Sequence, residues 1–468
     1  MNVKISLKKG NLIFFIYLIL FELLVITERS SFVGLGIIAF NCIALISNKK
    51  YFPYVIISSF LLNGEVLPIL NIIVCIIFSG KKIEYSKPKL KHLVILLTIF
   101  FVSLIQSIIN NTIINVIFYS GYLFIVYFLM LFIWNKIKID DVVPIAKEFV
   151  VIETIAVITQ LFMYRSFTPG DLYRGTLDSA HWLANFLLIA AVCIFCYKND
   201  FKRESIFGKI RKDFPIYVCI IFLIYFADAK TIIGSFAIGI VFFVIFEKIS
   251  KFKYPFIAFI ITFYLLIFVF SCIYKSDVVV AYMSEHFSDI SRYLYSSTMN
   301  GKFNYISGVF TDNMFSYKII FGNGIGQFGS RVSNLFAYSV MYRGDSALNH
   351  FIANNFSPHY LQEYANYISY YTSDFVENIR WISAVLSYPF NNVTSWFAET
   401  GAFGLIGIAS IVQYYLRDSK GKFLAYYFVV NCFFDIYFDN FPVVGIVVVM
   451  IAATRMSGDK YKQLKGNT

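Results

Sequence analysis

Basic residues are few in the segments that the charge pattern places outside a membrane. Arg165 and Arg174 precede the span that starts at His181, Lys230 lies between two spans, and the large later segment contains Arg331, Arg343 and Arg380. We single out Arg174, Lys230, Arg331, Arg343 and Arg380 as candidates. The Arg guanidinium is always charged and binds phosphate or carboxylate through two parallel hydrogen bonds. Isolated cations at that face predict a site for an anionic ligand. Ion pairs within loops, or side chains that snorkel to the membrane interface, are the alternative interpretation.

A glycine-rich segment and a glutamate form a second group of candidates. The segment is Phe321-Gly-Asn-Gly-Ile-Gly-Gln-Phe-Gly-Ser-Arg331. Glycines let the backbone approach a ligand and expose its N–H groups, although a plain turn has the same composition. Glu399 lies near the outer end of an apolar run, where an ionisable group is a functional candidate unless it only pairs with an Arg. Metal-ligand spacings and phosphate-binding motifs are missing from the sequence, which predicts neither a metal nor a cofactor.

The composition requires that these residues be positioned by membrane helices. The 468 residues are 58% hydrophobic and 15% charged, far from the average soluble protein. This excludes a soluble enzyme and a disordered chain. The net charge of +12 comes largely from clusters such as Lys49-Lys50 and Lys81-Lys82, which lie between apolar runs. That distribution is typical of cytoplasmic loops and not of a nucleic-acid-binding surface.

Apolar runs long enough to cross a bilayer, which needs about 20 residues, follow one another along the chain. They span 11–28, 32–47, 93–109, 113–134, 142–163, 181–197, 214–229, 231–246, 254–274, 394–416, 423–436 and 441–455. The run 51–79 has Lys pairs at both ends and Asn63-Gly64-Glu65 in its middle, so we expect it to double back near Asn63 and Gly64. A single crossing there would invert the topology of everything that follows.

The sequence therefore predicts an all-α polytopic integral membrane protein with about 12–14 transmembrane helices and both termini inside. We expect three parts: N-terminal transmembrane helices in 1–274, a large, partly helical external loop in 275–393, and C-terminal helices with a short cytoplasmic tail in 394–468. An interruption of that size between spans is usually functional.

Three stretches resemble elements of one family. Arg174-Gly-Thr-Leu-Asp-Ser-Ala-His181-Trp-Leu-Ala184 resembles an Arg- and Gly-containing element that runs into (P)N-x-x-A, with His181 where Asn is usual. Ala229-Lys230-Thr231 resembles a Ser-Arg/Lys-Gly/Thr element. Phe321-Gly-Asn-Gly-Ile-Gly, with the later Asn391-x7-Glu399-Thr-Gly401-x-x-Gly404, resembles the G-x-G-x-G and H-N…E-x-G-x-x-G elements that flank a large loop. The chain is thus similar to the bacterial O-antigen polymerase and ligase superfamily, in motifs over roughly 170–405 and in topology throughout.

The resemblance implies a GT-C-like, metal-independent glycosyltransferase of the bacterial cytoplasmic membrane. Its substrates would be undecaprenyl-diphosphate-linked glycans at the outer face, and its partners would include the bilayer and chain-length regulator and flippase proteins. Family polymerases join repeat units of O-antigen or capsule, whereas ligases transfer finished glycan to lipid A core or to protein. Ligases carry a His before the Asn of the third element. Phe390 occupies that position here, which favours a polymerase.

The same resemblance implies roles for the candidates. The five cations would stabilise the diphosphate leaving group, and a carboxylate or His would take the proton of the attacking sugar hydroxyl. Candidates for this base are Glu399, Asp345, His350 and His359, which the sequence does not rank. Tyr and Trp rings would stack on sugars, and an intramembrane groove would hold the polyprenyl chains.

Three alternatives remain open at the level of sequence: an O-antigen ligase, a flippase or other transporter of lipid-linked oligosaccharides, and a structural membrane subunit. A flippase should show matched halves and charged groups lining many spans. This chain instead concentrates its polar residues in one asymmetric outer segment.

Overall fold

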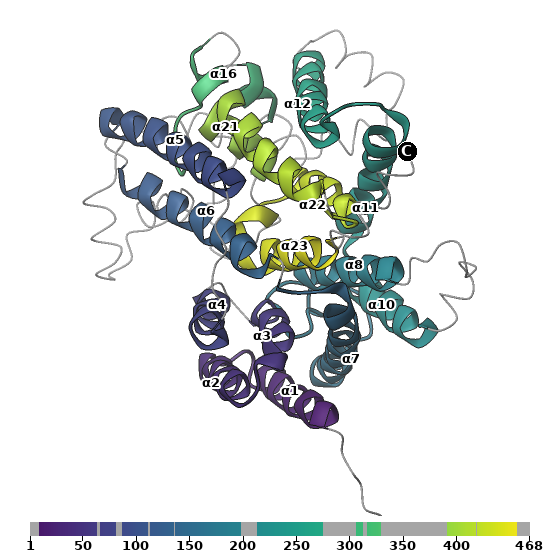
Figure 1. Ribbon diagram of the computed structural model, residues 1–468. Coiled ribbons are helices and arrows are strands. Elements are labelled where there is room, and N and C mark those ends of the chain that lie inside the picture. The colour runs from purple at the N-terminus through teal and green to yellow at the C-terminus, as the bar shows by residue number, and fades with distance from the viewer. Residues whose placement is uncertain are drawn as a thin grey trace, which may run out of the picture.

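The computed structural model describes residues 9–62, 66–80, 87–110, 113–134, 136–197, 213–274, 306–311, 316–328, 391–417 and 419–455 (Figure 1). These residues form helices and contain no strand, apart from an isolated bridge between Ser419 and Arg455. The predicted all-α class is confirmed for this part of the chain.

The first half of the chain forms α1 Lys9–Ile26, α2 Ser31–Ser47, the short 3-10 turn η1 Lys49–Tyr51, α3 Phe52–Ser59, α4 Val66–Ser79, α5 Lys87–Asn110, α6 Ile113–Ile133, α7 Ile139–Tyr164 and α8 Ala180–Tyr197. The second half forms α10 Phe214–Ala227, α11 Lys230–Phe243 with its π-helical extension η2 Val244–Ile249, α12 Pro255–Tyr274, α16 Lys318–Phe321, α21 Asn392–Leu416, α22 Lys422–Phe434, η4 Tyr437–Asp439 and α23 Phe441–Ala453. Every apolar run predicted from the sequence overlaps one of these helices.

Five helices of the described chain are long and apolar enough to cross a membrane. They cover Leu90–Ile108, Ile113–Ile133, Lys230–Ile249, Pro255–Ile273 and Asn392–Leu416, and shorter apolar helices accompany them. Large apolar side chains cover the outside as well as the core: Ile19 is 59% exposed and Ile105 is 62% exposed. A surface of this kind requires an apolar solvent, so the structure has the character of a multi-pass membrane protein.

The helix at the centre of the bundle is α23. All of its residues from Phe441 to Ala453 are buried, and it packs against α6, α8 and α22 (Figure 1). Gly445 lets α23 meet the segment that follows α3, because a Cβ at Gly445 would lie 1.9 Å from the Phe60 ring. α23 therefore packs against helices from both the first and the second half of the chain.

Residues 51–79 double back, as the sequence predicts. α3 has 8 residues and α4 has 14, and a Cβ on Gly80 would lie 2.5 Å from Nζ of Lys49, so the two ends of the segment meet. Eight helical residues rise only about 12 Å, too little to cross the roughly 30 Å hydrocarbon core. Non-helical backbone at that depth must be buried in protein, and Phe60, Leu61 and Leu62 are indeed buried.

Contacts between helix ends follow the predicted alternation. Ends predicted inside meet one another: Lys147 pairs with Asp213, and Lys422 pairs with Glu247 at 2.8 Å. Ends predicted outside also meet: the Gly170 N–H donates to the Phe226 carbonyl, and the Asn392 N–H donates to the Asp435 carbonyl. These two groups are called the inner end and the outer end below.

Single-cysteine labelling tests the membrane sides. In a background without native cysteines, Thr168→Cys at the outer end should react with an impermeant thiol reagent in intact cells. Lys50→Cys and Lys253→Cys should react only after the membrane is opened, because the basic clusters hold those loops inside. Opposite accessibility of positions 50 and 253 would refute the hairpin at 51–79, since one crossing there inverts all later loops.

Candidate functional site

Of the residues singled out from the sequence, the structure describes Arg174, Lys230 and Glu399, all at the outer end. Six further candidates, Asp345, His350, His359, Arg331, Arg343 and Arg380, lie outside the described residues, as does Phe390. The site is therefore built from the segment between α7 and α8, the start of α11, the glycine-rich segment, and the segment between α22 and α23.

Two side chains of α7, Gln160 and Glu153, bind the backbone of the segment that carries Arg174. Gln160 Oε1 accepts the backbone N–H groups of Arg174 and Gly175, both at 3.1 Å, and its Nε2 donates to the Gly175 carbonyl at 2.7 Å. The Glu153 carboxylate, fully buried, accepts the backbone N–H of Thr176 at 2.9 Å. Gly175 has φ 59°, and a Cβ there would lie 2.0 Å from Glu153 Oε2. Only glycine permits this close approach.

Arg29, after α1, joins Arg174 at this segment. Its Nη2 donates to the Gly175 carbonyl at 3.1 Å, while Arg174 Nη1 donates to the Asp178 carbonyl at 3.2 Å. Burial lowers the pKa of the Arg29 guanidinium, and the positive charge of Arg174 lowers it further. The Asp178 and Glu153 carboxylates act on Arg29 in the opposite direction, so the segment holds two guanidinium groups and two acids close together.

Sequence reasoning missed Arg29, although the criterion applied to Arg174 would have found it. It is an isolated cation at the predicted outer end of a span. Its backbone also carries a signal that only the structure reveals, because Glu28 and Arg29 have φ of 49° and 67°. Left-handed backbone costs a non-glycine residue about 1–2 kcal/mol, and such strain often accompanies functional sites.

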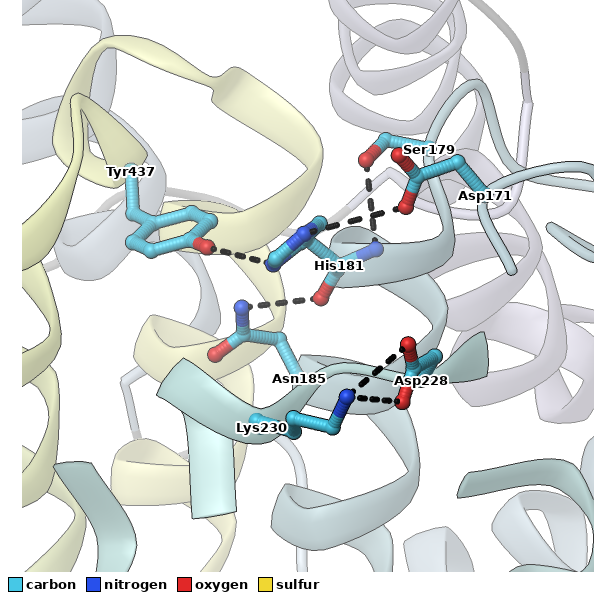
Figure 2. A network of polar contacts seen from close by, with 7 residues as sticks. All are labelled: Asp171, Ser179, His181, Asn185, Asp228, Lys230 and Tyr437. Carbon is cyan, nitrogen blue, oxygen red and sulfur yellow. Dashed lines mark hydrogen bonds and ion pairs between the residues drawn. The ribbon is translucent and has the colours of Figure 1, made fainter. Parts of the chain in front are cut away.

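Lys230 begins α11 and pairs with Asp228 at 3.2 Å. Its side chain is 84% exposed, so this pair contributes little to stability. Figure 2 draws the pair in the same view as His181 and Asn185 of α8. The ammonium of Lys230 is thus a solvent-facing cation at the outer end.

His181 connects two segments that are far apart in the sequence. Its Nδ1 lies 3.3 Å from the Tyr437 hydroxyl, and its Nε2 lies 4.0 Å from Oδ1 of Asp171 (Figure 2). Beneath it, Asn185 Nδ2 donates to the His181 carbonyl at 3.0 Å, and Asn185 Oδ1 accepts a hydrogen bond from Asn431 at 2.6 Å. The sequence marked His181 only as an exception to a motif, and gave no sign of these partners.

Glu399 holds the glycine-rich segment. Its fully buried carboxylate accepts the backbone N–H of Gly326 at 2.8 Å through Oε2 and that of Phe328 at 2.9 Å through Oε1. Its backbone carbonyl accepts the Gly324 N–H at 2.9 Å. Both oxygens of this candidate base are therefore engaged by backbone donors.

Close backbone contact makes this docking possible. α21 breaks at Gly401, with φ 58° and ψ −170°, and a Cβ there would lie 2.4 Å from the Ile320 carbonyl. A Cβ on Gly322, with φ 70°, would lie 2.3 Å from the Glu399 backbone. Gly322 and Gly401, both part of the motif that resembles the family, are thus required by this packing.

A belt of hydrogen bonds made by α6 joins the glycine-rich segment to the segment between α22 and α23. The Asn115 side chain donates to the Gly326 carbonyl at 2.9 Å, and one turn further along α6 the Tyr119 hydroxyl donates to Asp439 at 2.7 Å. Asp439 belongs to η4, the same short element as Tyr437. The belt therefore runs from Glu399 through η4 to His181 and the Arg174 segment.

The site thus combines cations with a histidine at one end of an apolar bundle. This arrangement can bind an anionic group and accept a proton beside it. Within the described residues, no three His, Cys, Asp or Glu side chains are grouped as a metal ion would need. No family model, no curated protein and no solved structure matches this chain. Function must therefore be inferred from the residues of the site.

Replacing Glu399 should release the glycine-rich segment. Glu399→Gln keeps the shape but turns an amide donor toward one of the two backbone N–H groups. Loss of a hydrogen bond to a charged group costs about 1.5–3 kcal/mol, which corresponds to roughly 10- to 100-fold faster exchange of amides in 322–328. Hydrogen-exchange mass spectrometry of the purified protein measures this. Glu148→Gln is the matched control, because Glu148 binds the Tyr54 hydroxyl at the inner end. Unchanged exchange in 322–328 would show that Glu399 does not anchor the segment.

Proposed function

We propose that this protein is a polysaccharide polymerase. It joins undecaprenyl-diphosphate-linked oligosaccharide repeat units at the outer face of the bacterial cytoplasmic membrane, for O-antigen or capsule. The proposal includes a GT-C-like arrangement with about 12–14 spans and an external segment 275–393. One observation carries it: hydrogen bonds run from Glu399 and Gly326 through α6 and η4 to His181, which belongs to the stretch of Arg174, so they link two of the three stretches that resemble the family.

The cations suit a diphosphate leaving group. When the bond to the anomeric carbon breaks, negative charge grows on the diphosphate, and donors already in position stabilise it most. Arg29 and Arg174 donate to the carbonyl oxygens of Gly175 and Asp178, and the charge of Arg29 also interacts with the Asp178 and Glu153 carboxylates. Lys230 adds an exposed ammonium at the same end.

An apolar cavity supports the lipid part of the proposed substrate. It has a volume of about 180 Å³ and lies among α6, α12, α21, α22 and α23, with Leu123, Tyr264, Ile411 and Phe428 in its lining. Trp396 and Phe438, whose rings lie 4.9 Å apart, also line it. Phe438 follows Tyr437 in η4, so the cavity reaches the belt that holds His181. A site with a wet polar end and an apolar interior fits a polyprenyl diphosphate.

The acceptor side of the proposal rests on fewer described residues. Asp345, His350 and His359 remain candidate bases outside the described part of the chain. Glu399 remains a candidate from the sequence, but its carboxylate already accepts two backbone N–H groups. Its geometry favours a role in positioning the glycine-rich segment. Flippase and chain-length regulator proteins are the partners that a polymerase would require.

Elongation of a lipid-linked repeat unit by the purified protein in liposomes tests the function directly. Wild type should convert single units into a ladder of longer glycans. Arg174→Ala and Arg29→Ala should each lower the rate by about 10²–10³, the usual cost of losing one transition-state donor, and Arg174→Lys should recover part of it. Arg165→Ala, in the same exposed segment, is the control and should elongate at close to the wild-type rate.

Gene deletion separates the alternatives in cells. A polymerase deletion should leave surface glycan capped at a single repeat unit. Repeat units trapped inside would indicate a flippase, and full-length polymer retained on the lipid carrier would indicate a ligase. Normal amounts of each variant, checked by immunoblot, exclude a loss of activity caused by misfolding.

A further inference from the structure

The outer end of α21 carries buried polar atoms with unused hydrogen-bonding capacity. Asn392 begins this 25-residue helix and Ser395 lies one turn later, and the two residues are 0% and 1% exposed. Neither the Asn392 Nδ2 amide nor the Ser395 hydroxyl makes a hydrogen bond within the described part of the chain. Burying a polar atom without a partner is costly, so these two atoms call for a ligand or ordered water.

The two atoms belong to one face of α21. Asn392, Ser395 and Glu399 are separated by three and four residues, which places them next to one another along the helix. Asn392 Oδ1 accepts the backbone N–H of Phe438 in η4 at 2.7 Å, whereas Glu399 binds the glycine-rich segment. Ser395, between them, therefore faces the junction of η4 and the glycine-rich segment.

An aromatic ring adjoins these atoms. Trp396 follows Ser395 in the chain and packs edge-on against Phe438, with ring centroids 4.9 Å apart. Trp396 is partly exposed, whereas the residues on either side of it are buried. Both rings also line the apolar cavity described above. Unused neutral polar atoms, an accessible aromatic ring and an apolar cavity thus lie side by side.

The charges nearby disfavour an anion. The N-terminus of α21 would attract one, but acidic residues lie on the helix itself and on the elements that it contacts. Glu399 lies one turn beyond Ser395. The Asp435 carbonyl accepts the Asn392 N–H at 3.3 Å, and Asp439 belongs to η4. A neutral ligand rich in hydroxyl groups fits better, because an amide donates to hydroxyls, a serine can donate or accept, and an indole packs on the C–H face of a sugar.

We infer that Asn392 and Ser395, together with Trp396, form a subsite for a sugar ring of the lipid-linked glycan. The inference rests on the proposed function and adds the residues that recognise the glycan, separately from the cations proposed for the diphosphate. The Asn392 amide donates to one sugar hydroxyl, and the Ser395 hydroxyl bonds to another. Trp396 packs against the apolar face of the ring, and the adjoining cavity takes the lipid part of the substrate.

Binding of the free oligosaccharide tests the subsite without requiring catalysis. The probe is the repeat-unit oligosaccharide of the producing cells, released from its lipid carrier by mild acid and titrated against the purified protein by NMR. Ser395→Ala removes one hydrogen bond to the sugar and should weaken binding about 3- to 10-fold. Asn392→Asp keeps the acceptor for the Phe438 N–H but loses the unused donor, and it should weaken binding to a similar extent.

The unfolding midpoint in detergent separates recognition from a structural role. Because the Ser395 hydroxyl has no partner in the described part of the chain, Ser395→Ala should leave the midpoint unchanged or raise it. In elongation assays the same variant should raise KM for the lipid-linked unit about 3- to 10-fold and keep kcat near the wild-type value. Ser410→Ala is the matched control, because the Ser410 hydroxyl of the same helix donates to the Ile406 carbonyl at 2.7 Å. It should bind and elongate like wild type.

The outcomes distinguish this inference from the function on which it rests. If wild type elongates and neither Ser395→Ala nor Asn392→Asp changes KM or the affinity for the oligosaccharide, the polar atoms bind only water and the inference is wrong. If wild type binds the oligosaccharide and both variants weaken it, but nothing is elongated, the subsite stands and the proposed polymerase fails. Absence of both binding and elongation refutes both. Should Asn392→Asp lower the unfolding midpoint, Ser395→Ala decides alone.

Discussion

A buried carboxylate that accepts backbone N–H groups is the interaction on which the outer end depends. Glu153 in α7 holds the segment of Arg174, and Glu399 in α21 holds the glycine-rich segment. A charge in an apolar bundle is costly unless hydrogen bonds replace its water. Loop N–H groups supply these bonds, and the carboxylates in turn satisfy loop donors that helices cannot reach. Without the carboxylate the loop N–H groups would lose their acceptor, and without the loop the buried charge would lose its hydrogen bonds.

This anchoring explains the glycines at the same places. Gly175 must pass within contact of Glu153, and Gly322 and Gly401 must let two backbones touch beside Glu399. Side chains there would push the loops away from their anchors. The packed apolar helices are a rigid frame. The hydrogen bonds from Glu153 and Glu399 fix the loops to this frame. Residues on such loops are held in position before any ligand arrives, which is what catalysis of group transfer requires.

The two ends of the bundle differ in how they treat cations. At the inner end, Lys147 and Lys422 pair with carboxylates, as solvated loops commonly do. At the outer end, Lys230 also pairs with Asp228, but Arg29 and Arg174 donate to backbone carbonyl oxygens, which orient the guanidinium groups. Phe438, which follows Tyr437 in η4, is one of the residues that line the apolar cavity. This asymmetry is what the proposed polymerase needs to bring a lipid-linked diphosphate to one face only.

The sequence alone determined the all-helical class, the bounds of the main helices and the reversal within 51–79, because long apolar runs in lipid leave the backbone few other options. It also identified Arg174, Lys230 and Glu399 as residues of interest. Only the tertiary structure decided what they do. The sequence left Glu399 either a functional acid or the partner of an Arg, whereas its oxygens accept the backbone N–H groups of Gly326 and Phe328. Arg29 joined Arg174, and Tyr437 joined His181, across 145 and 256 residues of sequence. Such pairs depend on which helix ends meet, and apolar periodicity constrains each helix without specifying its neighbours.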